Sequence, residues 1–330
     1  MKIAFFGTRP YEKDAFEREN TEFGHQINFL EPRLLTDTAA MAQGHECVCA
    51  FVNAELNKDT LKVLRDGGTK LIALRCAGFN HVDLPACQEL GIRVVRVPEY
   101  SPHAIAEHVV ALIQTLNRKT HRAFNRVREG NFSLNGLSGF DLYGKTIAII
   151  GTGKIGKTLG RIMRGFGCRV LLNDLYPDQE YAKEINAQYV CLEEIYKQSD
   201  IISLHVPLTP ETRHFINSNT LRMMKKGVML INTGRGALIN TIDLISALKM
   251  GHVGHAGLDV YEEEESFFFQ DLSGQVLSDD TLARLLTFPN VLITSHQGFL
   301  TNEAMDNIAH TTLKNVTEFE QEKVLTNEVT

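Results

Sequence analysis

The sequence predicts an α/β protein built on parallel sheets, and three observations carry this prediction. Short apolar runs rich in β-branched residues alternate with segments of helix length along the chain. These runs are apolar at nearly every position, so the strands they form need cover on both faces, as parallel sheets have. The chain has 330 residues, and at roughly 150 residues per domain this length predicts two domains.

The expected strands lie before and after one long helix. Those before it are 2–6, 47–52, 70–75 and 93–97. Those after it are 146–150, 169–173, 201–204, 228–232 and 291–294, with a further strand-like stretch at 255–261. Segments of helix length separate most of them, and such segments are what parallel strands need as connections.

Two helices are clear from the sequence. Ser101 followed by Pro102 is typical of a helix start, since a hydroxyl caps the first amides and proline fits the first turn. From there an apolar stripe predicts a helix to about Arg118, formed by Ile105, Val109, Ile113 and Leu116. A second stripe predicts a helix near the end of the chain, with Ala304, Ile308, Thr312, Leu313, Val316 and Phe319 on its apolar face. No strand is expected after this helix, so it must dock on a domain formed earlier in the chain.

The charge balance excludes several classes of partner. The chain has 34 Lys and Arg against 40 Asp and Glu, a formal net charge of −6, so no positive field attracts nucleic acid or anionic lipid. No apolar run approaches the about 18 residues that span a bilayer, and the first residues are expected to form a strand rather than a signal peptide. We therefore expect a cytoplasmic protein with no nucleic-acid or membrane partner.

The six cysteines predict neither a disulfide framework nor a metal site. They stand in apolar surroundings, without a C-x-x-C pair or a His-rich segment, at Cys47, Cys49, Cys76, Cys87, Cys168 and Cys191. We expect free, buried thiols in a reducing compartment and no bound metal.

A glycine turn follows the strand expected at 146–150. Gly151 permits a tight turn, Gly153 lets the backbone approach a pyrophosphate, and Gly156 lets the next helix pack closely on the strand. Asp174 ends the next expected strand, where its carboxylate would accept hydrogen bonds from an adenosine ribose and repel a 2′-phosphate. The pattern predicts NAD as cofactor, in preference to NADP. The alternative is a structural glycine turn beside a solvated aspartate.

One arginine stands in the turn after the strand expected at 228–232. Arg235 lies between Gly234 and Gly236, and ligands of open α/β sheets bind at the carboxyl ends of strands. A guanidinium there can hold a carboxylate through two parallel hydrogen bonds. Arg235 is thus predicted to bind an acidic substrate, with a surface arginine on a loop as the alternative.

A histidine and a run of glutamates follow two other expected strands. His296 comes after 291–294, and four consecutive glutamates, from Glu262 to Glu265, come after 255–261. A carboxylate beside an imidazole favours its protonated form, and such an imidazolium can donate a proton to a carbonyl oxygen. The alternatives are a structural histidine and a solvated acidic loop.

Seven short motifs occur in a fixed order along the chain. They are RCAGFNHVD at 75–83, VPEYSP at 97–102 leading to AEH at 106–108, GTGKIG at 151–156, HVPLTPET at 205–212, NTGRGA at 232–237, GLDVY at 257–261 and TSHQ at 294–297. This combination resembles the D-isomer-specific 2-hydroxyacid dehydrogenase family over essentially the whole chain. Within that family it is most similar to the fermentative, NAD-dependent D-lactate dehydrogenases.

The resemblance implies a fold and a domain organisation. Two Rossmann-like or flavodoxin-like domains with parallel sheets would hold an active site in the cleft between them. Residues 1–100 with 298–330 would form a discontinuous substrate-binding domain, and 101–297 would form the NAD-binding domain. The family also suggests a homodimer or homotetramer.

The resemblance also implies roles for individual residues. Arg235 would bind the substrate carboxylate, His296 would act as general acid and base, and Glu264 would keep His296 protonated. Glu264 is chosen because the family's catalytic glutamate lies five residues after the aspartate of the G-x-D-V-[YF] motif, here Asp259. Glu262, Glu263 and Glu265 are the alternatives if the register of this loop differs. The implied cofactor contacts are Gly151, Gly153, Lys154, Ile155, Gly156, Asp174, Val206, Pro207, Thr212, Thr233, Gly234 and Asp259. The implied substrate contacts are Ala77, Gly78, Tyr100, Arg235 and Phe299.

These roles imply reversible reduction of pyruvate to D-lactate with NADH as the reductant. Tyr100 and Phe299 match positions that line a small pocket in D-lactate dehydrogenases; the alternatives are that Tyr100 packs at the helix start and that Phe299 belongs to the core. Two other functions stay open on the sequence. One is reduction of a larger 2-oxoacid, glyoxylate or hydroxypyruvate, and the other is a nonenzymatic, NAD-sensing corepressor of the same fold.

Overall fold

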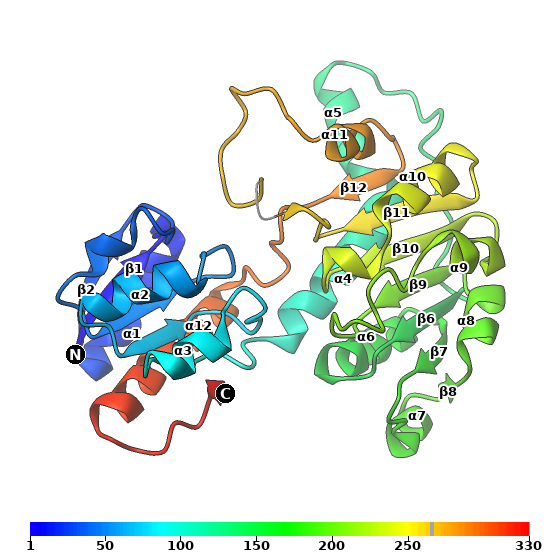
Figure 1. The fold of residues 1–330 in the computed structure, drawn as a ribbon. Helices are drawn as coiled ribbons and strands as arrows, with labels where there is room; N and C mark the ends of the chain where they lie inside the picture. The colour runs from blue at the N-terminus through cyan, green and yellow to red at the C-terminus, as the bar shows by residue number, and fades with distance from the viewer. Residues whose placement is uncertain (265–266, 330) are drawn as a thin grey trace. The chain divides into compact units, whose positions relative to one another are not determined.

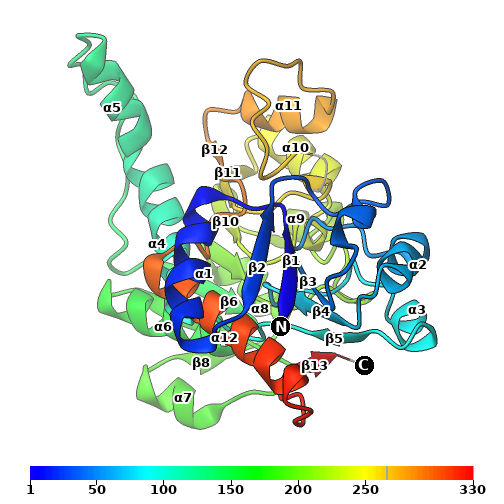
Figure 2. The ribbon, with the colours of Figure 1, turned by 90° about the vertical axis from the view of Figure 1, so that its left-hand side faces the viewer.

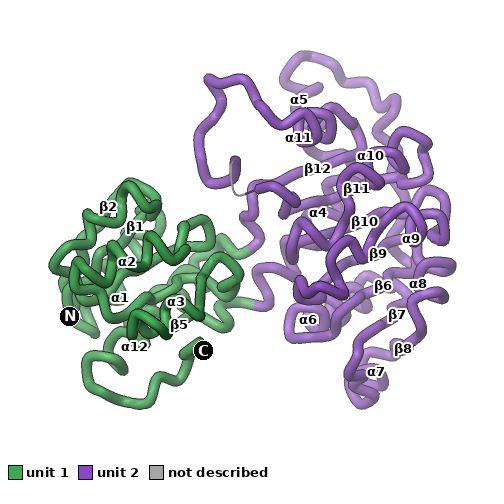
Figure 3. Tube along the Cα trace, viewed as in Figure 1, with its two compact units in different colours: residues 1–101, 299–330 green, residues 102–298 purple. Residues whose placement is uncertain are grey.

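The structure is a computed structural model that describes residues 1–264 and 267–329. The chain divides into two compact units (Figure 3). The first comprises Met1–Ser101 together with Phe299–Thr330, and the second comprises Pro102–Gly298. The first unit is therefore discontinuous in the sequence. Each unit contains one sheet and several helices, so the predicted α/β class is confirmed.

The sheet of the first unit has six strands in the order β13-β5-β4-β3-β1-β2, which are labelled in Figure 2; Figure 1 labels β1 and β2 of this sheet. Their bounds are β1 (Lys2–Phe6), β2 (Gln26–Leu30), β3 (Cys47–Ala50), β4 (Leu71–Leu74), β5 (Arg93–Val95) and β13 (Glu328–Val329). Neighbouring strands are parallel except β13, which runs antiparallel to β5. Every residue of β3 and β4 is buried, in agreement with their uninterrupted apolar sequence.

The last helix of the chain completes the first unit. Its helices are α1 (Pro10–Phe23), α2 (Lys58–Asp66), α3 (Leu84–Glu89) and α12 (Asn302–Glu320), with a 3₁₀ turn at Ala39–Ala42. α1 and α12 pack side by side although they lie at opposite ends of the sequence (Figure 2). The side chain of Thr301 accepts a hydrogen bond from the amide of Ala304 and so caps the start of α12.

The sheet of the second unit has seven strands in the order β12-β11-β10-β9-β6-β7-β8. Their bounds are β6 (Thr146–Ile150), β7 (Arg169–Asn173), β8 (Gln188–Tyr189), β9 (Ile201–Leu204), β10 (Val228–Asn232), β11 (Val253–Leu258) and β12 (Val291–Ile293). All neighbouring strands pair in parallel. Alternate residues of β6 enter two separate apolar cores, Ala148 and Ile150 in one, Ile147 and Ile149 in the other. Both faces of this sheet are therefore covered.

Helices of the second unit cover both faces of its sheet, whereas α5 (Thr120–Arg128) extends away from it. The other helices of this unit are α4 (Pro102–Arg118), α6 (Lys154–Gly165), α7 (Gln179–Glu184), α8 (Leu192–Gln198), α9 (Ser218–Met223), α10 (Thr241–Lys249) and α11 (Asp280–Leu286), with a 3₁₀ turn at Gly236–Leu238. α4 has the bounds predicted from its apolar stripe. Among the described residues, no helix is both long and apolar enough to cross a membrane.

The strand order reverses beside β6. The chain passes from β6 to β7 on one side of it and later returns to β9 on the other side. In open α/β sheets such a reversal opens a crevice at the carboxyl ends of the two strands, and ligands bind there. The turns after β6 and β9 are therefore the place where a binding site is expected.

Three strands of the structure are absent from the sequence prediction, namely β2, β8 and β13. All three lie at sheet edges, and their residues are exposed or only partly buried. Such strands lack the uninterrupted apolar run by which the central strands are predicted. The expectation that no strand follows the last helix is thus wrong, because β13 pairs with β5 after α12.

The thiols also differ in one respect from the prediction. All six cysteines are free, and Cys47, Cys49, Cys76, Cys87 and Cys168 are buried. Cys191 is exposed because it precedes α8 at the surface instead of lying in a strand. The expectation that every thiol is buried is therefore wrong for Cys191.

Candidate active site

The glycine turn joins the ends of β6 and β9. Gly151 has a φ of +96°, and a Cβ built on it would lie 2.6 Å from the carbonyl carbon of His205, the residue after β9. A Cβ on Gly156 would lie 2.1 Å from the carbonyl oxygen of Gly151. A side chain at either position would thus force the backbone apart. These glycines allow α6 to start directly against the strand ends where the strand order reverses.

The residues around this turn fit NAD. A Cβ on Gly153 would meet no atom within 4 Å among the described residues, so the backbone there is open to a ligand. The residue at the start of α6 is a glycine, which has no side chain to cap the helix, and the positive end of the helix dipole lies here, where a pyrophosphate binds in such folds. The hydroxyl of Thr233, buried after β10, has no hydrogen-bond partner among the residues described. This end of the sheet therefore offers polar groups to a bound ligand.

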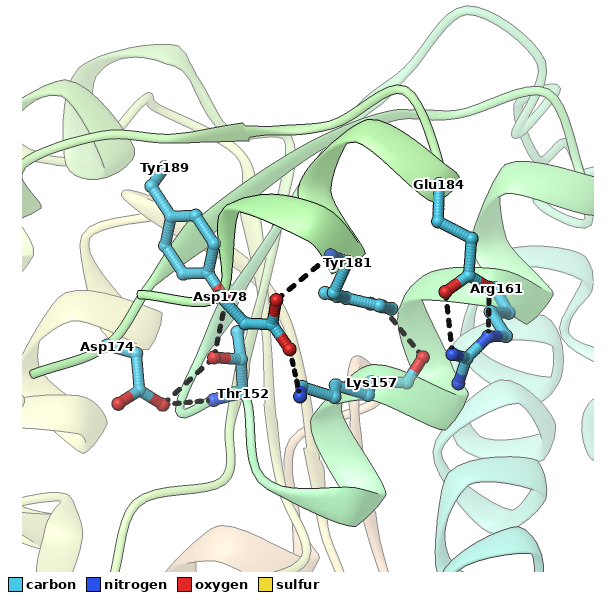
Figure 4. Close-up of polar contacts among 8 residues, drawn as sticks. All are labelled: Thr152, Lys157, Arg161, Asp174, Asp178, Tyr181, Glu184 and Tyr189. Carbon is cyan, nitrogen blue, oxygen red and sulfur yellow. Dashed lines mark hydrogen bonds and ion pairs between the residues drawn. The ribbon is translucent and has the colours of Figure 1, made fainter. Parts of the chain in front are cut away.

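Asp174 lies just after β7 and is held in place by the glycine turn (Figure 4). Its Oδ2 accepts hydrogen bonds from the amide and the hydroxyl of Thr152, at 2.6 and 3.0 Å, and its Oδ1 accepts one from the amide of Tyr176 at 2.9 Å. Burial raises the pKa of Asp174, but the hydrogen bonds from Tyr176 and Thr152 outweigh it and lower the pKa overall. The carboxylate is therefore ionised at neutral pH.

The turn after β10 carries Arg235 in a fixed loop. The side chain of Asn232 accepts a hydrogen bond from the amide of Gly234 at 3.1 Å and donates one to the carbonyl oxygen of Arg235 at 2.8 Å. The guanidinium itself donates to the carbonyl oxygen of Gly234 at 2.8 Å. Asn232 thus shapes the turn that presents Arg235, a role that the motif contains but that sequence reasoning did not assign.

The Arg235 turn lies against the loop that follows β11. A Cβ on Gly236 would lie 2.1 Å from the carbonyl carbon of Tyr261 and 2.4 Å from the amide nitrogen of Glu262. Only a glycine permits this approach of two backbones. The structure therefore brings the arginine turn next to the start of the glutamate run.

His296 and Glu264 form a hydrogen-bonded ion pair. The imidazole Nδ1 of His296 lies 2.7 Å from Oε1 of Glu264. The other oxygen of Glu264 accepts a hydrogen bond from the amide of Tyr261 at 2.8 Å, which fixes the carboxylate. Both side chains are less than one-fifth exposed, at 18% and 17%. The remaining imidazole nitrogen, Nε2, is left for a substrate.

Glu262, another glutamate of the run, binds away from His296. Glu262 contacts His214 at 2.5 Å and the hydroxyl of Thr241 at 3.1 Å instead. Burial raises the pKa of Glu262, but its hydrogen bonds from His214 and Thr241 lower the pKa overall. Glu265, which the sequence left as a possible partner of His296, lies outside the described residues.

Asp259, the last acidic residue before this run, organises the loop that carries His296. Its Oδ1 accepts hydrogen bonds from the hydroxyl of Thr294 at 2.6 Å and the amide of Gln297 at 2.9 Å, and its Oδ2 accepts one from the amide of Gly298 at 2.8 Å. His296 itself donates its amide to the carbonyl oxygen of Asp259 at 2.7 Å. The side chain of Asp259 thus accepts hydrogen bonds from residues on both sides of His296.

The backbone of His296 is in the left-handed region, with a φ of +53°. A non-glycine residue adopts this conformation only where its surroundings impose it. The hydrogen bonds to Asp259 fix the residues before and after it, and Nε2 of His108 reaches Oδ1 of Asp259 at 3.3 Å and the Thr294 hydroxyl at 3.1 Å. His108 and Thr294, which the sequence analysis left without roles, therefore buttress this loop.

His205 is excluded as the proton donor of the site. Burial lowers the pKa of His205 to about 4, so its imidazole is neutral near pH 7. Its Nε2 lies 2.8 Å from the hydroxyl of Ser203. His296, in contrast, is hydrogen-bonded to the carboxylate of Glu264 at 2.7 Å.

The loop after β9 contains three further residues assigned to the cofactor. Val206 and Pro207 directly follow His205, and the hydroxyl of Thr212 donates to the carbonyl oxygen of Pro207 at 2.7 Å and accepts from the amide of Thr209 at 2.8 Å. Thr212 therefore closes this loop on itself. The contacts of Val206, Pro207 and Thr212 with a cofactor stay predictions.

Four of the residues assigned to the substrate lie in the first unit. The carbonyl oxygen of Ala77 accepts a hydrogen bond from Nη1 of Arg96 at 2.7 Å, and the thiol of Cys76 donates to the carbonyl oxygen of Gly78 at 3.3 Å. In both contacts a backbone carbonyl oxygen of the loop after β4 is the acceptor. Arg96 thus fixes a loop that the family resemblance assigns to the substrate carboxylate.

The two aromatic residues assigned to the substrate pack together. The rings of Tyr100 and Phe299 lie 6.1 Å apart with their planes at 72°. A third ring, that of Phe51, lies 6.0 Å from Phe299. Phe51 follows β3, so its place at the carboxyl end of a central strand is the signal by which the sequence could have pointed to it.

Comparison with known proteins places the chain in a family. The family described as "D-isomer specific 2-hydroxyacid dehydrogenase, NAD binding domain" matches residues 110–298. A 2-hydroxyacid dehydrogenase homolog of Schizosaccharomyces pombe is 52% identical over 97% of this chain and 96% of its own length. The D-lactate dehydrogenase of Escherichia coli is 48% identical over the full length of both chains.

A solved structure agrees with these relatives. The structure of the pyruvate reductase of Chlamydomonas reinhardtii matches with a TM-score of 0.95 and 44% sequence identity, over 99% of this chain and 98% of that one. The resemblance inferred from the motifs and the assignment of NAD as the cofactor are therefore confirmed. The chain belongs to the D-isomer-specific 2-hydroxyacid dehydrogenases, and its second unit carries their NAD-binding domain.

Proposed function

We propose that this chain is a D-lactate dehydrogenase that reversibly reduces pyruvate with NADH. The observation that carries the proposal is the ion pair of His296 with Glu264, held beside the Arg235 turn at the carboxyl ends of the strands of an NAD-binding domain. Relatives named for D-lactate and pyruvate, at 48% and 44% identity over essentially the whole chain, support this choice of substrate.

The cofactor site is formed by residues of the second unit. The backbone of Gly153, Lys154 and Ile155 at the start of α6 binds the pyrophosphate, and Asp174 accepts hydrogen bonds from the adenosine ribose. Thr233 and Gly234, after β10, lie toward the nicotinamide. The bound nicotinamide supplies the hydride that reduces the substrate.

His296 supplies the proton for pyruvate reduction. Because Nδ1 of His296 is bonded to Glu264, Nε2 is the atom that donates the proton to the ketone oxygen, and it takes the proton back when lactate is oxidised. The carboxylate of Glu264, bonded to Nδ1, fixes the orientation of the imidazole ring. The hydrogen bonds of Asp259 fix the loop that carries His296, and so fix the direction in which Nε2 of His296 points.

Arg235 binds the substrate carboxylate through a two-point contact. Ala77, Gly78, Tyr100 and Phe299, all in the first unit, are assigned to the substrate by the family resemblance. Within that unit the rings of Tyr100, Phe299 and Phe51 pack together, and they would offer an apolar surface to a small substrate.

The segment after α4 suggests how copies of the chain associate. No residue of α5 is buried, and the exposed fractions of Phe124, Phe132, Leu134 and Tyr143 are 61%, 74%, 80% and 82%. Figure 2 shows α5 extending away from the sheet of its unit. Apolar side chains gathered on one segment are typical of an interface, so this segment joins two copies in a homodimer or in a homotetramer, in the cytoplasm.

The test is turnover of purified protein with NADH and a panel of 2-oxoacids. The highest kcat/KM is expected for pyruvate, and the product should be a substrate for a lactate oxidase specific for the D isomer. A higher kcat/KM for glyoxylate, hydroxypyruvate or a longer 2-oxoacid would replace D-lactate by that substrate. Tight NADH binding without any turnover would instead favour an NAD-sensing corepressor.

A further inference from the structure

A chain of hydrogen bonds links the glycine turn, the end of β7 and the edge strand β8. The hydroxyl of Thr152 lies 3.0 Å from Oδ2 of Asp174 and 2.8 Å from the hydroxyl of Tyr189 (Figure 4). Thr152 is the residue between the first two glycines of the turn and is only 5% exposed. Its hydroxyl therefore has a fixed position between a carboxylate and a phenol.

The direction of these hydrogen bonds follows from their chemistry. An ionised carboxylate only accepts, so the single hydroxyl proton of Thr152 is donated to Asp174. The oxygen of Thr152 is then an acceptor, and the phenol of Tyr189 must be the donor to it. Hydrogen bonds that point the same way along a chain strengthen one another. Tyr189 thus strengthens the hydrogen bond from Thr152 to Asp174.

We propose that Thr152, held by Tyr189, is the positioning residue that sets the preference of this chain for NAD over NADP. The inference rests on Asp174 as the residue that binds the adenosine ribose. Its carboxylate is partly exposed at the surface, where an unrestrained side chain would turn toward water. Because Thr152 fixes one oxygen and Tyr176 the other, the entropy of orienting Asp174 is lost before the cofactor binds. The fixed carboxylate then repels the 2′-phosphate of a bound NADP, because it cannot turn away from that phosphate.

Two cations of the neighbouring helix are paired with carboxylates other than Asp174. Lys157 is bound to Asp178 at 2.6 Å, and Arg161 is bound to Glu184 through two hydrogen bonds of 2.6 and 2.9 Å. Both side chains point toward carboxylates of α7 and the residue before it, as Figure 4 shows. Neither Lys157 nor Arg161 is therefore paired with the carboxylate of Asp174.

The test measures the Kd of NAD and of NADP by isothermal titration calorimetry, without a 2-oxoacid. Thr152→Val keeps the shape of the side chain and the backbone amide but removes the hydroxyl. It is expected to weaken NAD about tenfold, which one hydrogen bond to a charged group provides, and not to weaken NADP, because a released carboxylate can turn away from the 2′-phosphate. Tyr189→Phe should weaken NAD by about threefold, because it removes only the reinforcing donor. Thr152→Ser, which keeps the hydroxyl, should bind NAD as the wild type does.

A double substitution distinguishes a positioning role of Thr152 from direct contact of Thr152 with the cofactor. If Thr152 acts through Asp174, then adding Thr152→Val to Asp174→Ala should change the Kd of NAD by less than about twofold, since the two substitutions share one interaction. The same loss of NAD affinity in both backgrounds would overturn the proposal. An equal loss for NAD and NADP would overturn it as well, because a merely structural defect would affect both cofactors.

Two neighbouring positions provide matched controls. Thr158→Val removes a hydroxyl that donates to the carbonyl oxygen of Lys154 on the same helix, and Tyr181→Phe removes a phenol that donates to the carbonyl oxygen of Lys157 at 2.7 Å. Neither should change the ratio of the two Kd values, and a change as large as that of Thr152→Val would overturn the proposal. If Thr152→Val does not fold, Tyr189→Phe carries the test. A chain that discriminates NAD through Thr152 but reduces no 2-oxoacid would refute the proposed function alone.

Discussion

Replacing Asp259 by asparagine tests the view that its carboxylate aims His296. The carboxylate accepts one backbone amide on each oxygen, from Gln297 at 2.9 Å and from Gly298 at 2.8 Å. An asparagine has only one accepting oxygen. Whichever way its amide turns, an NH₂ group faces one of these backbone amides, and one buried donor is left without an acceptor.

The cost of Asp259→Asn follows from these contacts. An unsatisfied buried amide costs about 1–3 kcal/mol, and the loop can avoid this cost only by moving. Because a displacement of about 1 Å of a catalytic group lowers rates by about 10²-fold, we expect kcat for pyruvate to fall by at least this factor. The Kd of NADH should change less than about threefold, since the hydrogen bonds of Asp259 go to the loop around His296 and not to the glycine turn.

The pH dependence of stability gives a second readout for this variant. Burial raises the pKa of Asp259, but hydrogen bonds from His108 and Thr294 outweigh it and lower the pKa overall. A lowered pKa means that the ionised carboxylate stabilises the fold above the pKa of an unfolded aspartate, and that this contribution is lost as pH falls through the folded value. The melting temperature of the wild type should therefore exceed that of Asp259→Asn at pH 7, and the difference should shrink toward acid pH.

The assays are steady-state turnover of pyruvate, NADH binding by fluorescence, and thermal melts between neutral and acid pH. Asp279→Asn is a suitable control, because Asp279 caps α11 and binds the hydroxyl of Tyr261 at 2.7 Å without touching the His296 loop. It should lower the melting temperature but not kcat. An Asp259→Asn variant with the kcat of the wild type and weakened NADH would refute the reasoning, and would give Asp259 a direct role at the cofactor.

The other residues of the site make three further predictions. His296→Ala should lower kcat by about 10²–10⁴-fold, the usual worth of proton donation, with NADH binding retained; near-normal turnover would exclude His296 as the acid. Arg235→Lys should raise KM for pyruvate strongly, because an ammonium cannot make the two-point contact, and an unchanged KM would assign carboxylate binding to another residue. Glu264→Gln should lower kcat for pyruvate, since the imidazole of His296 loses the carboxylate that holds its Nδ1; an unchanged kcat would contradict the pairing seen in the structure.

The sequence predicts the central strands well because they are apolar at every position. The predicted bounds are those of β6, β7, β9 and β10 in the structure. Each of these strands is followed by a turn at the place predicted from the motifs. Edge strands escape prediction because one side of them meets water. β2, with the sequence QINFL, alternates too weakly to separate from a loop.

Some features of the site can be predicted from neighbouring residues, and others depend on contacts between residues far apart in the sequence. A glycine turn is a local feature, so Gly151, Gly153 and Gly156 can be found by their spacing alone. The choice of Glu264 from four consecutive glutamates needs the fold, because it depends on the turn at Tyr261 that directs one carboxylate to His296 and another to His214. The donors around Asp259 come from residues 35 or more positions away, and no local pattern reports such contacts.

The discontinuity of the first unit has a consequence for synthesis on the ribosome. The second unit is one continuous stretch, so it can fold as soon as it has emerged. The first unit lacks α12 and β13 until the last residues are made, because Asn315 on α12 binds the carbonyl oxygen of Arg96 and Glu328 on β13 binds Arg93. The face of α1 that receives α12 is thus uncovered while the whole second unit is translated. The segment made first is therefore the one that must wait longest for the contacts that complete its unit.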